Sequence, residues 1–151
     1  MENNSEIEFN VFLERFKKSV SKIGLKNSIQ KDYILKTLYF STEHLTAEEI
    51  SNKIKQNYNV SIGIATVYRA LSFLEEVDLI TSITFGTDGK KYESNAKSHH
   101  DHLICTTCGK IIEFIDDEIE KRQDKIAKKN KFRITSHSMQ LYGTCENCQE
   151  L

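Results

Sequence analysis

Two pairs of cysteines, each separated by two residues, constrain this chain more than any other feature. The first pair is Cys105 and Cys108, and the second is Cys145 and Cys148. One tight turn can present both thiolates of such a pair, and two pairs supply the four ligands of a tetrahedral zinc site. Because 36 residues separate the pairs, a folded segment must lie between them. We therefore expect zinc to tie together the ends of a small domain.

Disulfides are the main alternative explanation for four cysteines. The first ten residues, MENNSEIEFN, are polar and acidic and lack the apolar core of a secretory signal. No stretch is apolar enough over sufficient length to span a membrane. These features predict a cytoplasmic protein, in which thiols stay reduced and paired cysteines indicate metal or redox chemistry. A thioredoxin-type motif would need only one pair, so metal is favoured.

The first part of the chain has the pattern of four helices followed by a β-hairpin. Apolar residues at helical spacing and one capping box predict the helices, and alternating residues around glycines predict the hairpin. The expected helices cover 8–23 and 28–40, a segment opened by Thr46-Ala47-Glu48-Glu49, and 64–77. The expected strands cover 79–85 and 90–94, on either side of a turn at 86–89. This order is typical of a winged helix-turn-helix, whose fourth helix would enter the major groove of DNA.

Charge is uneven within this part, although the net charge of the whole chain is only −1. From Arg15 to Lys36 there are seven basic residues, and Asp32 is the single acidic one. Such a run is usually a solvated helix face, and it becomes a phosphate-facing surface only if the following helices bind DNA. On the helix over 64–77, Tyr68 and Arg69 point away from the apolar face. Their side chains suit contacts with sugars, thymine methyl groups, phosphate or guanine.

A polar linker at 94–98 divides the chain into a winged-helix domain, 1–94, and a second domain, 99–151. In the second domain we expect strands over 103–105, 111–115 and 132–142 and a charged helix over 116–130. The fold class is therefore α+β, with a small α/β domain at the C-terminal end. A domain this small needs a metal or a partner subunit to be stable, so dimerisation through its sheet is expected.

The segment His99-His100-Asp101-His102 can supply two different metal sites. Side chains alternate along a strand, so His100 and His102 share one face while His99 and Asp101 share the other. Mixed histidine and carboxylate ligands suit a divalent first-row metal that exchanges with solution. Further candidates downstream are Glu113, Glu120 and His137, the last expected on the third strand. For His44, which lies far upstream, the spacing alone indicates no role.

These motifs resemble the ferric uptake regulator (Fur) family over nearly the whole chain. The resemblance lies in GLKNSIQKDYIL (24–35), HLTAEEI (44–50), IGIATVYRALSFLEE (62–76), KKYE (90–93), HHDHLICTTCGKIIEF (99–114) and the final CENC. It implies an N-terminal winged helix, a C-terminal dimerisation domain and metal-dependent control of DNA binding. The expected partners are an AT-rich palindromic operator in double-stranded DNA and a second copy of the chain, with higher assemblies on DNA as a further option.

The resemblance also implies a role for every histidine and cysteine. The structural zinc ligands would be Cys105, Cys108, Cys145 and Cys148. The regulatory ligands would be His44, Glu93, His100, His102 and Glu113, and an additional site would comprise His99, Asp101, Glu120 and His137. Lys26 resembles a residue that enters the minor groove, and Tyr68 and Arg69 resemble residues of the recognition helix. The regulatory metal would be Fe²⁺, replaceable by Mn²⁺, Co²⁺ or Zn²⁺ in vitro, in a repressor of iron-uptake and iron-homeostasis genes.

Where members of the family commonly carry a Thr-x-x-Arg-like segment, this chain has Asn27-Ser28-Ile29-Gln30-Lys31. Lysine can still neutralise phosphate but lacks the bidentate fork of arginine. Glutamates at positions 93 and 113 favour iron sensing over the peroxide-sensing branch, which uses aspartates there, and zinc sensing stays an alternative. A zinc metalloenzyme would need a ligand position open to water and a motif such as HExxH, which the sequence lacks. We therefore expect a regulator and no enzyme.

Overall fold

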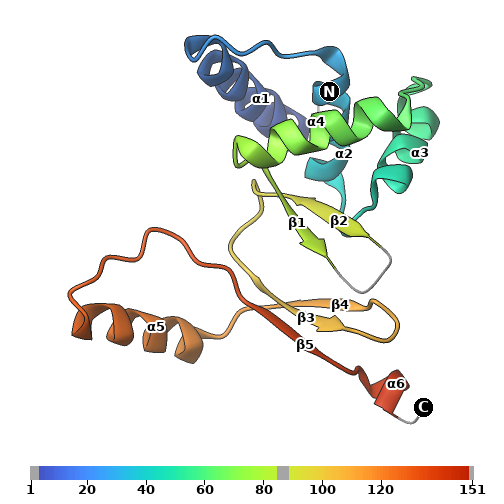
Figure 1. The fold of residues 1–151 in the computed structure, drawn as a ribbon. Coiled ribbons are helices and arrows are strands. Elements are labelled where there is room, and N and C mark those ends of the chain that lie inside the picture. Colours follow the sequence, from blue (N-terminus) through green and yellow to red (C-terminus); the bar gives the residue numbers. More distant parts are fainter. Residues whose placement is uncertain (1–3, 85–88, 150–151) are drawn as a thin grey trace. The chain divides into compact units, whose positions relative to one another are not determined.

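Residues 4–84 and 89–149 are described by the computed structural model, which divides into two compact units (Figure 1). The first unit comprises the residues up to 84 together with 89–97, and the second begins at Ser98. The first unit contains α1 (Asn4–Lys22), α2 (Ile29–Phe40), α3 (Ala47–Tyr58), α4 (Ile64–Glu76), β1 (Ile80–Thr84) and β2 (Lys90–Ser94). Four helices followed by a hairpin agree with the expected winged-helix order.

Local sequence signals define where these helices begin and end. Gly24 follows α1 with a φ of +76°, a left-handed conformation in which glycine avoids the steric penalty of a Cβ atom. At the start of α3 the capping box is formed in both directions. The Thr46 N–H donates to Glu49 Oε2 at 2.7 Å, and the Glu49 N–H donates to Thr46 Oγ1 at 3.2 Å. Asn59, with a φ of +54°, closes the other end of α3.

The core of the first unit lies where α2, α3 and α4 meet. Their fully buried side chains recur at the helical spacing that the sequence shows, namely Ile34, Leu35, Leu38, Ile50, Ile54, Val67, Leu71 and Leu74. Phe9, Phe16 and Val20 of α1 pack onto the same core. Burial of this apolar surface is the main term that holds the helices together.

The hairpin is attached to the helices by a backbone bridge. β1 and β2 pair antiparallel, with Ile80 opposite Ser94 and Thr84 opposite Lys90. Leu45 pairs with Tyr92 of β2, and the two N–H···O distances are 3.0 and 2.8 Å. This bridge places the loop before α3 directly beside β2. The turn expected at 86–89 lies outside the described residues except for Gly89.

The second unit is a three-stranded sheet with one long helix. Its elements are β3 (Asp101–Cys105), β4 (Ile111–Phe114), α5 (Asp117–Lys129), β5 (Gln140–Gly143) and the short α6 (Glu146–Gln149). The strand order is β4-β3-β5, with β3 antiparallel to β4 and parallel to β5. The Asp116 carboxylate begins α5 by accepting the N–H groups of Glu118 and Ile119 at 2.9 and 3.1 Å. The α+β fold class expected from the sequence is thus observed.

The strand expected over 132–142 is wrong for most of its length, because only Gln140–Gly143 is a strand. β5 pairs with β3 from His102 onward, and β3 itself begins at Asp101. Residues before Met139 therefore find no strand to pair with in the described part of the sheet. His137 consequently lies in an irregular segment between α5 and β5, whereas the sequence predicted it on the third strand.

None of the helices within residues 4–84 and 89–149 combines the length and the apolar character that a membrane span requires.

We expect Thr46→Ala to lower the free energy of unfolding of the first unit by about 1 kcal/mol, because it removes the hydroxyl that caps α3. Thr46→Ser keeps the hydroxyl and should stay close to the parent. The measurement is denaturant unfolding followed by circular dichroism. Equal losses in both variants would show that the hydroxyl is not the stabilising group.

Candidate metal centres and DNA-binding surface

Four thiols converge at one end of the sheet in the second unit. Cys105 ends β3 and Cys108 follows in a turn closed by the Gly109 N–H, which donates to the Cys105 carbonyl at 2.9 Å. The other pair brackets the start of α6, where the Cys148 N–H donates to the Cys145 carbonyl at 2.8 Å. The Thr106 N–H donates to the Gly143 carbonyl at 2.8 Å and thereby holds the two pairs side by side.

The distances between the sulfur atoms fit the ligands of a tetrahedral metal and are too long for a disulfide bond. All four Sγ atoms lie within 4.8 Å of one another, and those of Cys108 and Cys145 are 3.7 Å apart. Zn–S bonds of about 2.3 Å in a tetrahedron would separate the sulfurs by about 3.8 Å, whereas an S–S bond is about 2.05 Å long. All four cysteines are free thiols.

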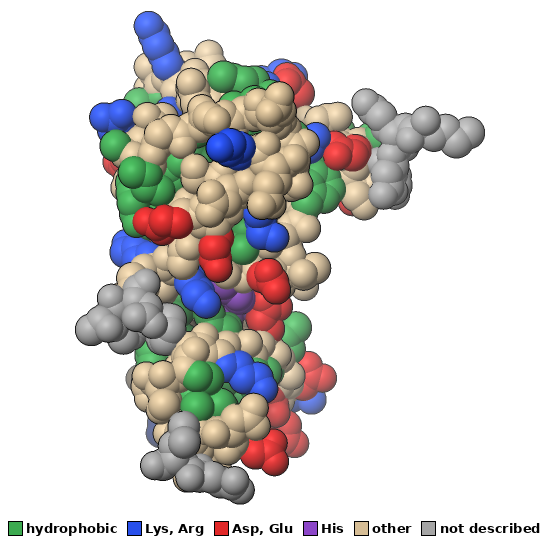
Figure 2. Space-filling model, turned by 90° about the vertical axis from the view of Figure 1, so that its right-hand side faces the viewer, with side chains coloured by type: hydrophobic (Ala, Val, Ile, Leu, Met, Phe, Trp, Pro, Cys, Tyr) green, Lys and Arg blue, Asp and Glu red, His purple; other side chains and the backbone are tan. Residues whose placement is uncertain are grey.

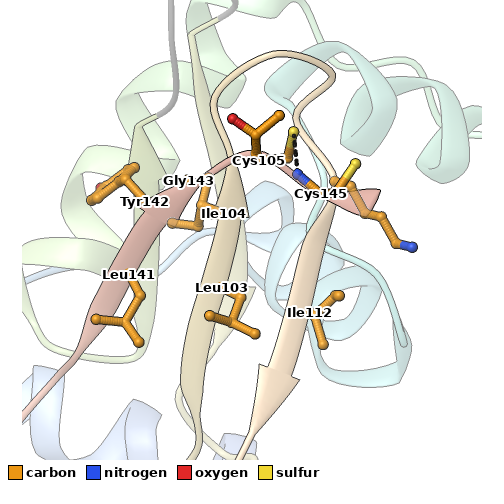
Figure 3. A pocket seen from close by; sticks show the side chains of 10 residues that line it. Leu103, Ile104, Cys105, Ile112, Leu141, Tyr142, Gly143 and Cys145 are labelled. Atoms are coloured by element: carbon orange, nitrogen blue, oxygen red, sulfur yellow. Dashed lines mark hydrogen bonds between the residues drawn. The ribbon is translucent and has the colours of Figure 1, made fainter. Parts of the chain in front are cut away.

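Backbone donors prepare one of these thiols for metal binding. The Cys145 N–H donates to Cys105 Sγ at 3.3 Å, a contact drawn in Figure 3. Together with the backbone N–H groups of Cys108 and Thr107, it lowers the pKa of Cys105 to about 5, so this group is a thiolate at neutral pH. Hydrogen bonding to the Cys145 thiol and burial raise the pKa of Cys148 to about 12. Binding of a metal would therefore release protons from this cluster.

A second cluster lies within the same unit, around the start of β3. It joins His99, Asp101 of β3, Glu120 of α5 and His137 of the segment before β5. Glu120 Oε1 lies 3.4 Å from His99 Nε2 and 3.2 Å from His137 Nε2. The Asp101 Oδ1 atom lies 3.6 and 3.8 Å from the same two nitrogens. The two imidazole rings meet edge to face, with their centroids 4.2 Å apart.

Several atoms of this cluster are buried without a hydrogen-bond partner. Asp101 is only 1% exposed, and neither carboxylate oxygen finds a donor within the described residues. His137 Nε2 and Glu120 Oε1 also have no hydrogen-bond partner. The two atoms are 3.2 Å apart but are not aligned for a hydrogen bond. Buried carboxylates without partners are costly. A divalent cation bound by two imidazoles and two carboxylates would satisfy all four groups, so this donor set fits a first-row metal.

The remaining candidates form one group in each unit. In the first unit, His44 Nε2 lies 3.2 Å from Glu93 Oε2, and each side chain is 6% exposed. The Leu45–Tyr92 bridge brings these two residues together. His44 precedes Leu45 and Glu93 follows Tyr92, so they lie opposite each other next to this antiparallel bridge. In the second unit, His100 Nε2 lies 3.6 Å from Glu113 Oε1, and the rings of His100 and His102 have centroids 4.8 Å apart.

The proposed DNA contacts are all exposed on the first unit. Tyr68 of α4 is 45% exposed, and its hydroxyl donates to Glu48 Oε1 of α3 at 3.1 Å. This hydrogen bond raises the pKa of Tyr68. Arg69 is exposed beside it and donates to Thr66 Oγ1 at 3.3 Å. Lys26 is exposed in the loop between α1 and α2.

Charge on the surface is mixed. On the face shown in Figure 2, basic and acidic side chains are interspersed, in agreement with a net charge of −1. Binding to a polyanion would therefore depend on particular basic side chains and not on the net charge of the protein.

Sequence reasoning missed the partner of Tyr68. Glu48 was recognised only as part of the capping segment, and 20 residues separate it from Tyr68. Nothing in the local pattern of either helix signals this hydrogen bond, because it arises from the packing of α3 against α4. Its effect is to hold the Tyr68 ring in place on the exposed side of α4.

A winged-helix unit joined to a small sheet that carries clusters of metal-binding side chains defines a metal-responsive DNA-binding regulator. The sequence profile of the Ferric uptake regulator family matches residues 22–142. The chain belongs to this family, whose members are metal-dependent DNA-binding transcription regulators and not enzymes. This membership confirms the expected function class and removes the metalloenzyme alternative.

Curated relatives and solved structures agree with this family assignment. The ferric uptake regulation protein of Campylobacter jejuni subsp. jejuni serotype O:2 is 52% identical over 143 residues, covering 94% of this chain and 91% of the relative. That of Helicobacter pylori strain 26695 is 46% identical over 138 residues, or 91% of each chain. The structure of the H. pylori ferric uptake regulator, described as revealing three functional metal-binding sites, matches with a TM-score of 0.79 at 44% identity, covering 95% of each chain. A peroxide stress regulator of C. jejuni also matches, with a TM-score of 0.62 at 28% identity, covering 77% of this chain and 99% of that one.

We expect Cys105→Ser and Cys148→Ser to lose zinc, to unfold the second unit and to leave monomers. The reason is that metal binding to such a module contributes on the order of 10 kcal/mol to folding. Zinc content, sedimentation and thermal unfolding measure the three effects. Asn147→Ala, an exposed change within the same cysteine pair, is the matched control. A stable dimer after complete removal of zinc would contradict this expectation.

Proposed function

We propose that this protein is a homodimeric repressor of iron-uptake and iron-homeostasis genes that binds its operator when Fe²⁺ is bound. The observations that carry the proposal are two incomplete donor groups, one in each unit. The His44–Glu93 pair offers two donors, and His100, His102 and Glu113 offer three. Neither group alone fills a coordination sphere of five or six ligands, and together they would bind one regulatory metal.

The metal at each site follows from the chemistry of its donors. Four thiolates suit zinc as a permanent structural ion at Cys105, Cys108, Cys145 and Cys148. Imidazole and glutamate donors suit an exchangeable divalent metal at the regulatory site, and Fe²⁺ could be replaced there by Mn²⁺, Co²⁺ or Zn²⁺ in vitro. The names of the relatives, as ferric uptake regulation proteins, support iron. Zinc sensing and peroxide sensing are the alternatives within the family.

The additional site, comprising His99, Asp101, Glu120 and His137, has a different proposed role. All of its donors belong to the second unit, so a metal bound there would join β3 to α5 and to the segment before β5. It would stabilise the dimerisation domain and would affect DNA binding less than the regulatory site. The unsatisfied Asp101 and Glu120 oxygens support binding of a cation at this position.

Dimerisation is supported by an exposed apolar row on the second unit. Ile112, Leu103 and Leu141 are direct neighbours across β4, β3 and β5, and Figure 3 shows all three on the same side of the sheet. Each is more than 40% exposed. An apolar row of this kind suits a protein interface, and a symmetric dimer would present the same face from both subunits. We accordingly propose 99–151 as the dimerisation domain and 1–94 as the DNA-binding domain.

A two-fold symmetric dimer would bind a palindrome in double-stranded DNA, which we propose to be AT-rich. α4 would enter the major groove with Tyr68 and Arg69 facing the DNA, and Lys26 would enter the adjacent minor groove. Since DNA is the partner, we propose that the protein acts in the cytoplasm.

The proposed switch is a shift between arrangements of the two units. A metal favours DNA binding only if it binds the DNA-competent arrangement more tightly than the others, since equal affinity would shift nothing. A change from 1:99 to 99:1 requires roughly a 10⁴-fold preference, about 5.5 kcal/mol, which coordination by donors of both units could supply.

We expect Lys26→Ala and Arg69→Ala to weaken operator binding while leaving metal affinity and dimerisation intact. Loss of a phosphate contact should also reduce the slope of log K against log salt concentration by about one unit. Fluorescence anisotropy across a salt series measures both effects. If both variants bind like the parent at every salt concentration, the DNA-binding surface is elsewhere.

The test of the function is a titration of zinc-replete protein with Fe²⁺, Mn²⁺ or Zn²⁺, with binding to AT-rich palindromes as the readout. We expect the parent to bind only with metal, and His44→Ala to keep its zinc, fold and dimer but to need at least about tenfold more metal. His137→Ala, in the additional site, is the matched control and should change the metal response less. A parental response in His44→Ala together with loss in His137→Ala would assign sensing to the additional site.

A further inference from the structure

Within the loop between α1 and α2, each of the residues 24–28 takes part in a hydrogen bond. The N–H groups of Gly24 and Leu25 donate to the carbonyls of Ser21 and Val20, each at 3.1 Å. At the other end of the loop, Ser28 caps α2 by accepting the Lys31 N–H at 3.4 Å. The middle of the loop, Lys26 and Asn27, is held by side chains of the first turn of α2.

Lys31 holds the backbone of Lys26. Its Nζ donates to the Lys26 carbonyl at 3.0 Å and lies 3.6 Å from the centroid of the Phe73 ring. Phe73 belongs to α4 and packs against the core of the unit, so the ring is a fixed platform. The ammonium group thus connects the loop to the helix that carries Tyr68 and Arg69.

The position of Lys31 is electrostatically unfavourable without these contacts. It lies in the first turn of α2, where the helix dipole disfavours a positive charge. The Lys26 carbonyl and the face of the Phe73 ring both offer negative potential at this point and offset that cost. Movement of Lys31 toward a phosphate would break both contacts at once.

Asn27 and Asp32 hold the other side of the loop. Asn27 Nδ2 donates to Asp32 Oδ1 at 2.5 Å, and Asp32 Oδ2 lies 3.1 Å from Lys17 Nζ of α1. These contacts tie the loop to both flanking helices. Among the described residues no hydrogen bond or ion pair engages the Lys26 side chain, which is exposed. The result is a loop restrained by contacts on both sides that presents one unoccupied ammonium group.

We infer that Lys31 is a positioning residue that fixes Lys26 for insertion into DNA, and that it does not itself contact phosphate. This inference rests on the proposed function, in which Lys26 contacts the operator. A side chain presented on an ordered loop loses less conformational entropy on binding than one on a mobile loop. Lys31 therefore contributes to operator affinity only through Lys26.

A double-mutant cycle on the full-length, metal-loaded protein tests this inference. We expect Lys31→Met to weaken operator binding about threefold to tenfold in the parent. In the Lys26→Ala background the same change should have an effect of less than about twofold, and the salt slope should not change further. Lys31→Arg keeps a cation that can reach both the carbonyl and the ring, and should bind within about twofold of the parent.

Direct contact of Lys31 with phosphate has a different signature. Lys31→Met would then cost the same factor in both backgrounds and would remove about one further unit of salt slope from Lys26→Ala. That result, no loss in the parent, or a loss in Lys31→Arg as large as in Lys31→Met would overturn the inference. Failure of the metal-loaded parent to bind any operator would instead overturn the proposed function, and the inference with it.

A readout without DNA separates positioning from a general loss of stability. Amide hydrogen exchange of residues 25–28 should accelerate in Lys31→Met while exchange in α3 stays at the parental rate. Lys26→Ala should leave the exchange of both segments unchanged, because its side chain holds nothing in place. Equal acceleration in α3 and in the loop would show that Lys31 only stabilises the unit, and would overturn the inference.

Discussion

One short strand supplies a side chain to each of the candidate metal clusters, and all of these clusters require its register. β3 contributes Asp101 to the proposed additional site, His102 to the proposed regulatory group and Cys105 to the thiol cluster. Side chains alternate along the strand, so a slip of one residue would exchange the faces of Asp101 and His102 and dismantle both histidine clusters. Neighbours fix the register on both sides, through hydrogen bonds of the His102 N–H with Met139 and of the Cys105 N–H with Lys110 at 3.1 and 2.9 Å.

In this arrangement, a zinc bound at the thiol cluster would also affect regulation. The thiol cluster lies at the end of β3, where the Thr106 N–H donates to the carbonyl of Gly143 at the end of β5. Zinc would therefore stabilise the register that presents His100 and His102 on one face and His99 and Asp101 on the other. In the proposed mechanism the zinc is permanent and sets the geometry, while the exchangeable metal reports its concentration through the donors of both units.

Local signals in the sequence predicted most of the fold. The Thr46–Glu49 capping box, the glycine after α1 and the alternation of donors over 99–102 each depend on a few neighbouring residues, and each is present in the structure. Features that depend on contacts between residues far apart in the sequence could not be predicted. The parallel pairing that begins at Gln140 depends on where β3 starts, so the strand over 132–142 was overextended. The roles of Glu48 and Lys31 depend on helix packing, and His44 lies beside Glu93 only because Leu45 pairs with Tyr92.

In the proposed mechanism, the regulatory metal and the operator favour the same arrangement of the two units. This coupling can be measured as the affinity of Mn²⁺ for zinc-replete protein, determined by electron paramagnetic resonance with and without a saturating operator duplex. Coupling is reciprocal, so the operator should tighten Mn²⁺ binding by the same factor by which Mn²⁺ tightens operator binding. A Mn²⁺ affinity that is the same with and without the operator would rule out this coupling.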